Sequence, residues 1–498
     1  MASPPVTAQP RESLAAASAR MHAHGVGSVV VVRGDALVGI LTERDLVRAG
    51  AAGADPEVDT VAAWMTPDPD TVGPDVEVVD AWRSLAAHGY RHIPVVADTA
   101  VVGVVSQRDL VRLAQLRPVD GVYSDVPKGL EGVVAAETAL GGVRGLEGFY
   151  HYRQYSAVEL ARHRSFEDAW WLLFEGELPG PAEQRAFASE LAPLSTLPDE
   201  VVAVLPALAR GPAPVLDKLR TAVSLLGAAT AMRPSRDLSR SELRRDCLRL
   251  CAALPALAAA LWRLGQGEEI LSPRPELGVA ASYLWMLTGT APSPVQRRAV
   301  EQYLTSTIDH GLNASTFTAR VVTSTGADAA AAVVAGIAAL SGPLHGGAPS
   351  RALDTLDAIG VPERADAYIR AAVDRGDRMM GFGHRVYRTL DPRSELMREV
   401  AEGLGGPLVA FAEEVESTVV RVLAELKPGR ALYANVEFYA GVVMELCGIP
   451  RPMFTPTFTL SRAVGWCAHV LEQAADNRII RPTSRYVGLS PPEPVPAA

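Results

Sequence analysis

The sequence is poor in lysine, cysteine and aromatic residues, and it has no long uninterrupted apolar run. Only three of its 47 basic residues are lysine, and the basic residues are scattered and outnumbered by 57 acidic ones. The net charge of −10 makes a basic surface for nucleic acid unexpected. Four cysteines do not make a disulfide scaffold, and apolar runs of at most 12 residues fall short of the ~20 that cross a bilayer. We therefore expect a cytoplasmic protein that contacts neither nucleic acid nor membrane.

The composition that remains is that of a globular protein with an ample core. It is 48% hydrophobic and 21% charged, and 498 residues predict two to four domains at about 150 residues each. Cys247 and Cys251 stand four apart, as on one helix face, but no histidine or further cysteine lies nearby to complete a zinc site. We interpret them as buried free thiols and expect no metal.

An internal repeat occupies the first part of the chain. Residues 7–50 align without gaps on residues 71–114 at a constant offset of 64, with 16 identities in 44 pairs. Each copy predicts a helix ending at glycine, two short strands joined by a turn, and a second helix. The predicted strands are 28–32 and 37–41 in the first copy, and 93–96 and 101–105 in the second. Two such α/β units are expected to pack about a pseudo-twofold axis.

The repeat resembles a tandem pair of CBS domains. The resemblance is carried by VGILTERD at 38–45 and VGVVSQRD at 102–109, with Met65-Thr66 and RHIPV at 91–95. It implies an adenosine nucleotide (ATP, ADP or AMP) in the cleft between the copies, with Asp45 and Asp109 on the ribose and Thr42 and Ser106 on phosphate. A carboxylate can accept two hydroxyl protons, and a helix N-terminus favours phosphate. The alternative is that these four residues only cap helices.

From residue 129 onward the pattern is almost wholly helical, with long Ala/Leu/Arg segments separated by proline and glycine. A short β ribbon is expected within 129–154. The predicted helices include 198–205, 218–230, 241–264, 294–308, 327–340, 364–375, 395–404 and 408–426.

Three histidines of this helical part lie in glycine-rich, turn-like surroundings. They are His310, His345 and His384, and their spacings of 35 and 39 residues match no local metal motif. Glycine neighbours let an imidazole approach a ligand closely. The segment 381–388 lacks the G-x-x-x-x-G-K-[ST] pattern, so it does not indicate a nucleotide triphosphatase. Its Arg385 and Arg388 could still meet the phosphates of a coenzyme.

Residues 127–487 resemble the citrate synthase family, in the bacterial form that includes 2-methylcitrate synthases. The main motifs are LNASTF at 312–317, GPLHGGA at 342–348, GFGHRVY at 381–387, DPR at 391–393 and NVEFYAG at 435–441. Shorter ones are PKGLEGV at 127–133, FTP at 454–456, Ser461-Arg462 and Arg481-Pro482. The fold class expected is therefore multidomain, with an N-terminal α/β CBS-domain pair followed by a mostly α-helical citrate synthase fold.

The resemblance implies a role for each matched residue. His345 would donate a hydrogen bond to the thioester oxygen of acetyl-CoA, an acid in 435–441 would remove the methyl proton, and His384 would polarise the keto group of oxaloacetate. His310, Arg393, Arg462 and Arg481 would hold carboxylates, with Arg481 reaching in from a partner subunit of a homodimer or larger oligomer. The chemistry suits these residues, because a weakly acidic α-proton needs a base and an electrophile together. No tightly bound cofactor is implied; acetyl-CoA is a cosubstrate.

One position departs from the family, because the base is usually Asp and here it is Glu437. The extra methylene would move the carboxylate by about 1 Å or more if the backbone held still, and ~1 Å can cost ~10²-fold in rate. We expect the local backbone to compensate and the enzyme to be active.

The predicted organisation is a CBS regulatory module at 1–118, a linker at 119–128, a catalytic domain with large and small helical subdomains at 129–487 and a disordered tail at 488–498. The predicted activity is the condensation of acetyl-CoA with oxaloacetate in the tricarboxylic acid cycle, under allosteric control by adenine nucleotide. Three alternatives stay open: a 2-methylcitrate synthase using propionyl-CoA, a weakly active paralogue that binds a partner in response to nucleotide, and an N-terminal module that only dimerises.

Overall fold

The computed structural model describes residues 4–88, 90–110, 128–130, 132–345, 348–377, 379, 381–383, 387, 390–426, 433–484 and 486–488, with only the backbone at 79, 83, 86–88 and 348–352. Internal contacts divide the chain into two compact units, residues 1–136 and 137–498. Most of the predicted linker (119–127) and tail (489–498) lies outside the described residues.

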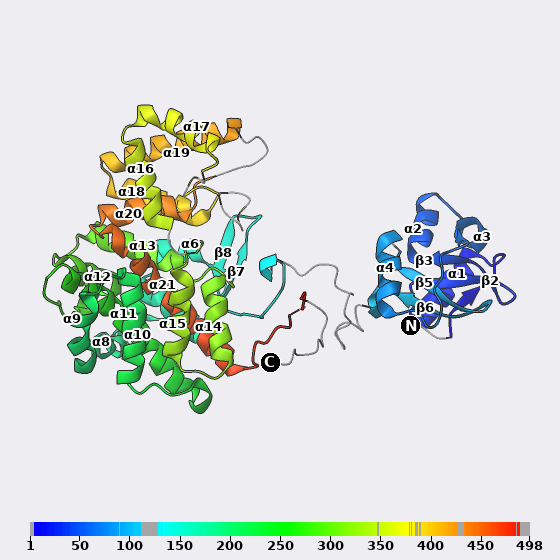
Figure 1. Ribbon diagram of the computed structural model, residues 1–498, viewed down its shortest axis with the longest axis horizontal. Helices are drawn as coiled ribbons and strands as arrows, with labels where there is room; N and C mark the ends of the chain where they lie inside the picture. The colour runs from blue at the N-terminus through cyan, green and yellow to red at the C-terminus, as the bar shows by residue number, and fades with distance from the viewer. Residues whose placement is uncertain are drawn as a thin grey trace, which may run out of the picture. The chain divides into compact units, whose positions relative to one another are not determined.

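The first unit is a sheet flanked by short helices (Figure 1). Its strands follow the order β1-β2-β3-β6-β5, and β4 pairs with β3. The strands are β1 (Thr7–Ala8), β2 (Ser28–Arg33), β3 (Ala36–Thr42), β4 (Thr66–Pro67), β5 (His92–Ala97) and β6 (Ala100–Ser106). The helices are α1 (Leu14–His24), α2 (Glu43–Ala51), α3 (Val61–Trp64) and α4 (Val78–His88).

The sequence repeat is confirmed in the pairing of the strands. Hairpin β2–β3 pairs Ser28 with Thr42 and has a register shift between Val31 and Val32. Hairpin β5–β6 repeats both features 64 residues later, at His92 with Ser106 and between Val95 and Val96. The turns also match, since Gly34 and Asp98 both adopt positive φ, a conformation that glycine and aspartate tolerate.

The second unit begins with a small antiparallel sheet and continues mostly as helix. The predicted β ribbon is confirmed and extends two residues beyond the predicted range. It consists of β7 (Gly141–Arg144), β8 (Phe149–Tyr152) and β9 (Tyr155–Ser156), paired in that order. The helices are α6 (Ala157–His163), α7 (Phe166–Glu175), α8 (Pro181–Leu194), α9 (Asp199–Ala209), α10 (Val215–Ala229), α11 (Arg240–Gly265), α12 (Val279–Thr288), α13 (Pro294–Thr307), α14 (Ala314–Ser324), α15 (Ala329–Leu340), α16 (Ala348–Ile359), α17 (Ala365–Asp374), α18 (Pro392–Leu404), α19 (Pro407–Leu426), α20 (Val436–Leu446) and α21 (Phe454–Ala475). Short 3₁₀ turns lie at Lys128–Leu130, Ser235–Asp237, Pro275–Leu277, Pro362–Arg364 and Arg451–Met453.

Local sequence explains where several of these helices start. Helix α11 begins at a capping box in which Ser239 and Glu242 bond each other's backbone N–H groups, and α7 begins at the same kind of box, formed by Ser165 and Asp168. Helix α13 has Ser293 as its N-cap and proline in its first turn. For α11 and α13 these signals place the helix start within one residue of the sequence expectation.

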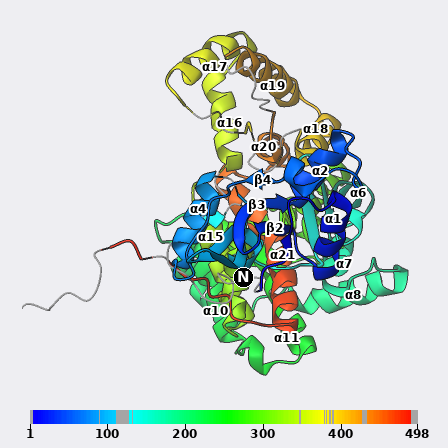
Figure 2. The ribbon, with the colours of Figure 1, turned by 90° about the vertical axis from the view of Figure 1, so that its right-hand side faces the viewer.

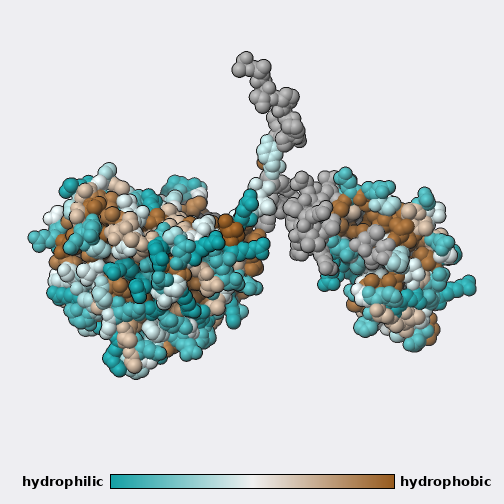
Figure 3. All heavy atoms as spheres, turned by 90° about the horizontal axis from the view of Figure 1, so that it is seen from below, coloured by the Kyte–Doolittle hydropathy of each residue, from teal (hydrophilic) through white to brown (hydrophobic). Residues whose placement is uncertain are grey.

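Helix α11 is the central helix of the second unit, and α8, α9, α10, α12, α15 and α21 all pack on it. Of the helices that the structure describes, α11 is the single one that is long and apolar enough to cross a membrane. Helices α8 and α9, bent by 64° at the break between them, meet the same criterion of length and composition when they are taken as one span. The most apolar stretch of α11 is 78% buried inside the protein, as in a core helix. The face of the unit seen in Figure 3 is mostly hydrophilic, with apolar side chains in small groups.

The helices of the second unit form two parts, a larger one called the body and a smaller layer at one end of it. Figures 1 and 2 both show α16, α17 and α19 gathered at one end, with α18 and α20 between them and the body. Helices α18 and α20 pack on each other and on α13 of the body. Residues at the N-terminal ends of α18 and α20 can therefore face residues of the body across one boundary.

Candidate active site

A cavity of about 960 Å³ lies at this boundary and collects five of the predicted site residues. His310 is in the loop between α13 and α14, and His345 follows α15. Arg393 and Glu437 stand in the first turns of α18 and α20, and Arg462 lies in α21. Two imidazoles, two guanidinium groups and one carboxylate thus share one space, although they come from five different segments.

The ring of His345 is held by Ser315 at the start of α14. The Ser315 backbone N–H donates to His345 Nε2 at 3.3 Å, and the Ser315 hydroxyl lies 2.8 Å from the same nitrogen. Trp466 Nε1 donates to that hydroxyl at 3.2 Å, which fixes its position. Burial, and then the charge of Arg462, lower the pKa of His345 to about 4. At neutral pH the ring is therefore uncharged, accepts at Nε2 and carries its hydrogen on Nδ1.

His310 is packed between two tyrosines. Its Nε2 lies 2.9 Å from the hydroxyl of Tyr387, and the ring centroids of Tyr150 and Tyr387 lie 5.7 and 5.5 Å away. Gly311 follows with φ of 64° and donates its backbone N–H to the carboxylate of Asp309 at 3.1 Å. This positive φ suits glycine and turns the chain directly after the histidine.

Arg393 is 4% exposed and carries its own counter-ion. Its Nε and Nη2 donate to the two carboxylate oxygens of Asp391 at 3.0 and 2.8 Å. Burial alone would lower the pKa of Arg393, but Asp391 outweighs it and the pKa is raised. Asp391 also caps α18 and accepts the backbone N–H of Val436 at 3.3 Å, so one carboxylate joins the starts of α18 and α20.

Arg462 is 2% exposed and forms no ion pair with any of the residues that the structure describes. Its Nε donates to the carbonyl of Thr307 at 3.0 Å, and its guanidinium lies 4.7 Å from the centroid of the Phe458 ring. Burial lowers the pKa of Arg462, and the charge of Asp309 opposes that shift. A buried cation without an ion pair on a cavity wall favours an anionic ligand.

Glu437 lies half-buried at the N-terminus of α20, where the backbone is well fixed. The N-cap residue Asn435 accepts the backbone N–H of Glu437 at 3.1 Å and donates its amide to the carbonyl of Gly383 at 3.0 Å. The helix start therefore sets the reach of the Glu437 carboxylate into the cavity.

Other predicted residues lie elsewhere. His384 and Arg388 fall outside the described residues. Arg481 is exposed in the segment that follows α21 and is not among the residues that line the cavity. Sequence reasoning missed Ser315, Asp391 and Trp466; the first two stand inside motifs that it had already identified.

In the first unit, the four predicted nucleotide contacts form two matching capping boxes. The Thr42 hydroxyl donates to Asp45 at 2.7 Å, and the Ser106 hydroxyl donates to Asp109 at the same distance. The capping role is thus observed. Near them, His92 Nδ1 is buried without a hydrogen-bond partner in the described structure, and its ring lies against Gly27. An orphaned buried nitrogen beside both boxes is compatible with a polar ligand there.

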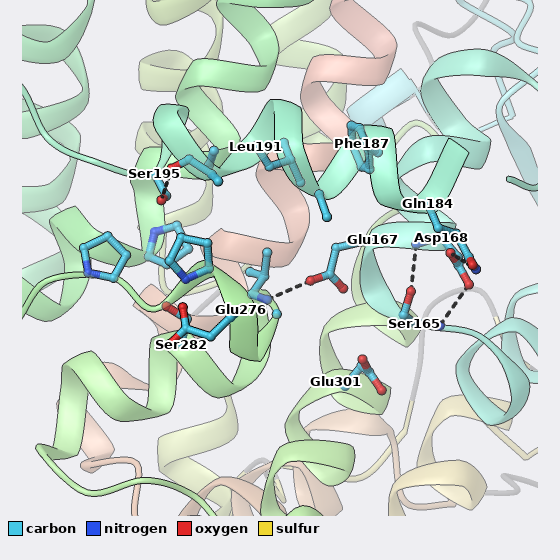
Figure 4. Close-up of a pocket in the computed structure, with 18 of the residues that line it drawn as sticks. Ser165, Glu167, Asp168, Gln184, Phe187, Leu191, Ser195, Glu276, Ser282 and Glu301 are labelled. Atoms are coloured by element: carbon cyan, nitrogen blue, oxygen red, sulfur yellow. Dashed lines mark hydrogen bonds between the residues drawn. The ribbon is translucent and has the colours of Figure 1, made fainter. Parts of the chain in front are cut away.

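The second unit (residues 137–498), called the catalytic unit below, has another cavity of about 350 Å³ among α7, α8, α11, α12 and α13 (Figure 4). Glu167 and Glu301 both point toward it, and Glu167 accepts the backbone N–H of Val279 at 2.7 Å. Burial raises the pKa of Glu167, against the effect of its backbone hydrogen bonds. Of the predicted site residues that the structure describes, none lines this cavity.

Among the described residues, no three or more His, Cys, Asp or Glu side chains are arranged to hold a metal ion. All four cysteines are free and buried, as the sequence predicts. The side chains that line the larger cavity supply a carboxylate for proton transfer, imidazoles for hydrogen bonding and guanidinium groups for anion binding.

Comparison with known proteins agrees with this inventory. The model of the citrate synthase C-terminal domain matches residues 129–483, and that of the CBS domain matches residues 1–52 and 59–115. Citrate synthase of Deinococcus radiodurans is 37% identical over 366 residues, covering 73% of this chain and 96% of that protein. The crystal structure of citrate synthase from Thermotoga maritima is 32% identical, with a TM-score of 0.66, and covers 75% of this chain and 98% of its own.

A third relative is a ternary complex of the Thermoplasma acidophilum citrate synthase with carboxymethyl coenzyme A and oxaloacetate. It is 28% identical, with a TM-score of 0.69, over 75% of this chain and 98% of that one. The predicted fold, a CBS pair followed by a mostly helical citrate synthase fold, is confirmed. The chain belongs to the citrate synthase family and is an enzyme of that kind, with two CBS domains before its citrate synthase domain.

Proposed function

We propose that the catalytic unit condenses acetyl-CoA with oxaloacetate to give citrate and CoA through an enol intermediate. The observation that carries this proposal is the pairing of a neutral, hydrogen-bonded His345 with Glu437 in a cavity that also holds two buried guanidinium groups. The Thermoplasma relative binds a CoA derivative together with oxaloacetate, which supports the same pair of substrates here.

The keto acid would bind first to fixed positive charge. Arg462, buried without an ion pair among the described residues, would take one carboxylate, and Arg393, held by Asp391, would take the other. His310, which also lines the cavity, would add a hydrogen bond. Because these groups are fixed by packing, little reorganisation is needed when the dianion arrives.

The thioester would then be deprotonated between two groups. The carboxylate of Glu437 would take a methyl proton, and Nδ1–H of His345 would donate to the thioester oxygen as negative charge develops there. The enol carbon would attack the keto carbon of oxaloacetate, whose oxygen takes up a proton, and water would then cleave the thioester to release citrate and CoA. His384, predicted to polarise the keto group, lies outside the described residues.

The test follows CoA release with a thiol reagent, using oxaloacetate with acetyl-CoA or propionyl-CoA in parallel. Release with acetyl-CoA is expected. Release only with propionyl-CoA would make the enzyme a 2-methylcitrate synthase, and release with neither would overturn the proposal in favour of a weakly active paralogue. Arg462→Lys is the matched variant, because it keeps the charge and loses the planar two-pronged donor; its KM for oxaloacetate should rise.

We also propose that the CBS pair binds an adenine nucleotide and controls the catalytic unit. Support comes from the match to two CBS domains and from the unpartnered His92 Nδ1 beside the two capping boxes. Calorimetry with ATP, ADP and AMP tests binding to the full chain, and Asp109→Asn should weaken it. Glu242→Ala, in the Ser239 capping box of α11, is the control that loses a box elsewhere. If millimolar nucleotide changes neither stability nor kinetics, this part of the proposal fails.

A homodimer, with Arg481 completing the site of the partner subunit, is proposed as the minimal assembly, and the cytoplasm as the location. Sedimentation of the purified full chain tests the dimer.

A further inference from the structure

A buried network of polar side chains lies behind the cavity, and none of its four members lines the cavity itself. Its members are Asp309 before α14, Arg320 in α14, and His469 and Glu472 in α21. Three of them, Asp309, Arg320 and His469, are between 1 and 5% exposed. Charges that are buried so deeply are costly unless their partners are well arranged. We call these four residues the polar network.

Arg320 determines which ring nitrogen of His469 carries the hydrogen. Its Nη1 donates to the carboxylate of Glu472 at 2.6 Å and to His469 Nδ1 at 3.0 Å. A guanidinium can only donate, so His469 Nδ1 must accept and carries no hydrogen. The neutral ring therefore carries its hydrogen on Nε2, which lies 3.2 Å from Asp309 Oδ1 and donates to it.

Asp309 connects His469 to the loop that carries His310. One of its carboxylate oxygens accepts from His469, and the other accepts the backbone N–H of Gly311. Its own backbone N–H donates to the hydroxyl of Tyr152 at 3.3 Å. The residue before His310 is thus held by Tyr152 and His469, and the residue after it is held by Asp309. The negative charge of Asp309 also acts on the buried guanidinium of Arg462.

The other end of the network reaches the start of the catalytic unit. Glu472 accepts the backbone N–H of Ala139 at 2.7 Å, just before strand β7. The network therefore runs from this segment through α21 and α14 to the loop of His310.

We propose that the polar network positions His310 for the keto-acid substrate. Its members are positioning residues, since none of them lines the cavity. This inference depends on the proposed function in one respect only, which is that the substrate held by His310 is oxaloacetate. Without the donor at His469, Asp309 would face an apolar group while still charged, and the loop would be expected to relax away from the cavity.

The test compares His469→Leu with His469→Gln in the full chain. Leucine removes both hydrogen bonds, whereas the glutamine amide can accept from Arg320 and donate to Asp309. We expect His469→Leu to raise the KM for oxaloacetate at least tenfold, with the KM for acetyl-CoA changed less than twofold, and His469→Gln to stay within about threefold of wild type. Cys467→Ala, a buried change two residues earlier in α21, is the control for lost packing, and should lower stability without changing the KM for oxaloacetate.

A second measurement does not depend on turnover. Amide hydrogen exchange in the free protein should become faster across residues 309–313 in His469→Leu, and should stay slow in His469→Gln and in Cys467→Ala. Unchanged exchange there, or a glutamine variant that behaves like leucine, would overturn the inference. If wild-type protein releases no CoA from either thioester, the proposed function fails while the exchange result still decides the role of the network.

Discussion

Shortening Glu437 to aspartate tests whether this active site is built around glutamate. The start of α20 is anchored three times: Asn435 donates its backbone N–H to Gly381 at 2.8 Å and its side chain to Gly383, and Val436 donates to Asp391. The backbone therefore cannot advance to compensate for a shorter side chain. In Glu437→Asp the carboxylate should withdraw by about 1.5 Å, the length of one carbon–carbon bond.

The size of the effect follows from that displacement. A misplacement of ~1 Å can cost ~10²-fold in rate, which corresponds to about 2.7 kcal/mol in the barrier. We expect Glu437→Asp to lower kcat about a hundredfold. The KM for oxaloacetate should change little, because Arg393 and Arg462 are untouched.

The assay is CoA release under saturating substrates, with the melting temperature as a check on folding. Glu445→Asp, the same shortening at the far end of α20, is the matched control and should keep kcat near wild type. A faster Glu437→Asp enzyme would refute the reasoning, because it would show that the cavity is shaped for aspartate and that the natural glutamate is misplaced.

Three further predictions concern pH, assembly and the second cavity. Because the pKa of His345 is lowered to about 4 and its neutral form is the donor, kcat should show no loss near pH 6.5 as pH falls, and His345 should contribute a loss only near pH 4; a pH profile of kcat with half-loss near 6.5 would contradict this. If Arg481 serves the partner's site, mixing and refolding inactive Arg481→Ala with inactive His345→Ala should restore about a quarter of wild-type activity, since half of randomly formed dimers contain one intact site; no recovery would place Arg481 in its own subunit's site or in neither. Burial raises the folded-state pKa of Glu167, so the stability of the wild-type protein falls as pH rises through that pKa. The Tm of Glu167→Gln should exceed that of the wild type by about 2 °C at pH 7.5, and this gain should disappear toward pH 4. A Tm difference between variant and wild type that is the same at both pH values would argue against this reasoning.

Much of the fold follows from local signals in the sequence. The 64-residue repeat predicted two α/β units, and the structure repeats even the position of the register shift, at Val31 and at Val95. Helix boundaries were predictable where serine caps or prolines mark them, as at Ser239 and Ser293. These features are set by residues close together in the sequence, so one sequence alone is enough to predict them.

The gathering of His310, His345, Arg393, Glu437 and Arg462 rests on long-range packing, and it was expected only through family resemblance. The ion pair of Arg393 with Asp391 lies within one short motif, yet its second role, bonding Val436 some 45 residues away, depends on how α18 meets α20. His469 gave no sequence signal, because its function comes from contacts with α14 and with the loop of His310.

The central position of α11 has a consequence for how the protein is made. This helix offers an apolar surface to six other helices, two of which, α15 and α21, are synthesised after residue 328. Until they arrive, a nascent or partly unfolded chain exposes the apolar part of this 26-residue helix to its surroundings. Transiently exposed apolar surface of this kind makes a chain prone to aggregate. Thermal unfolding of the catalytic unit should therefore end in aggregation, and its working lifetime at high temperature should be governed by the rate at which α11 is uncovered.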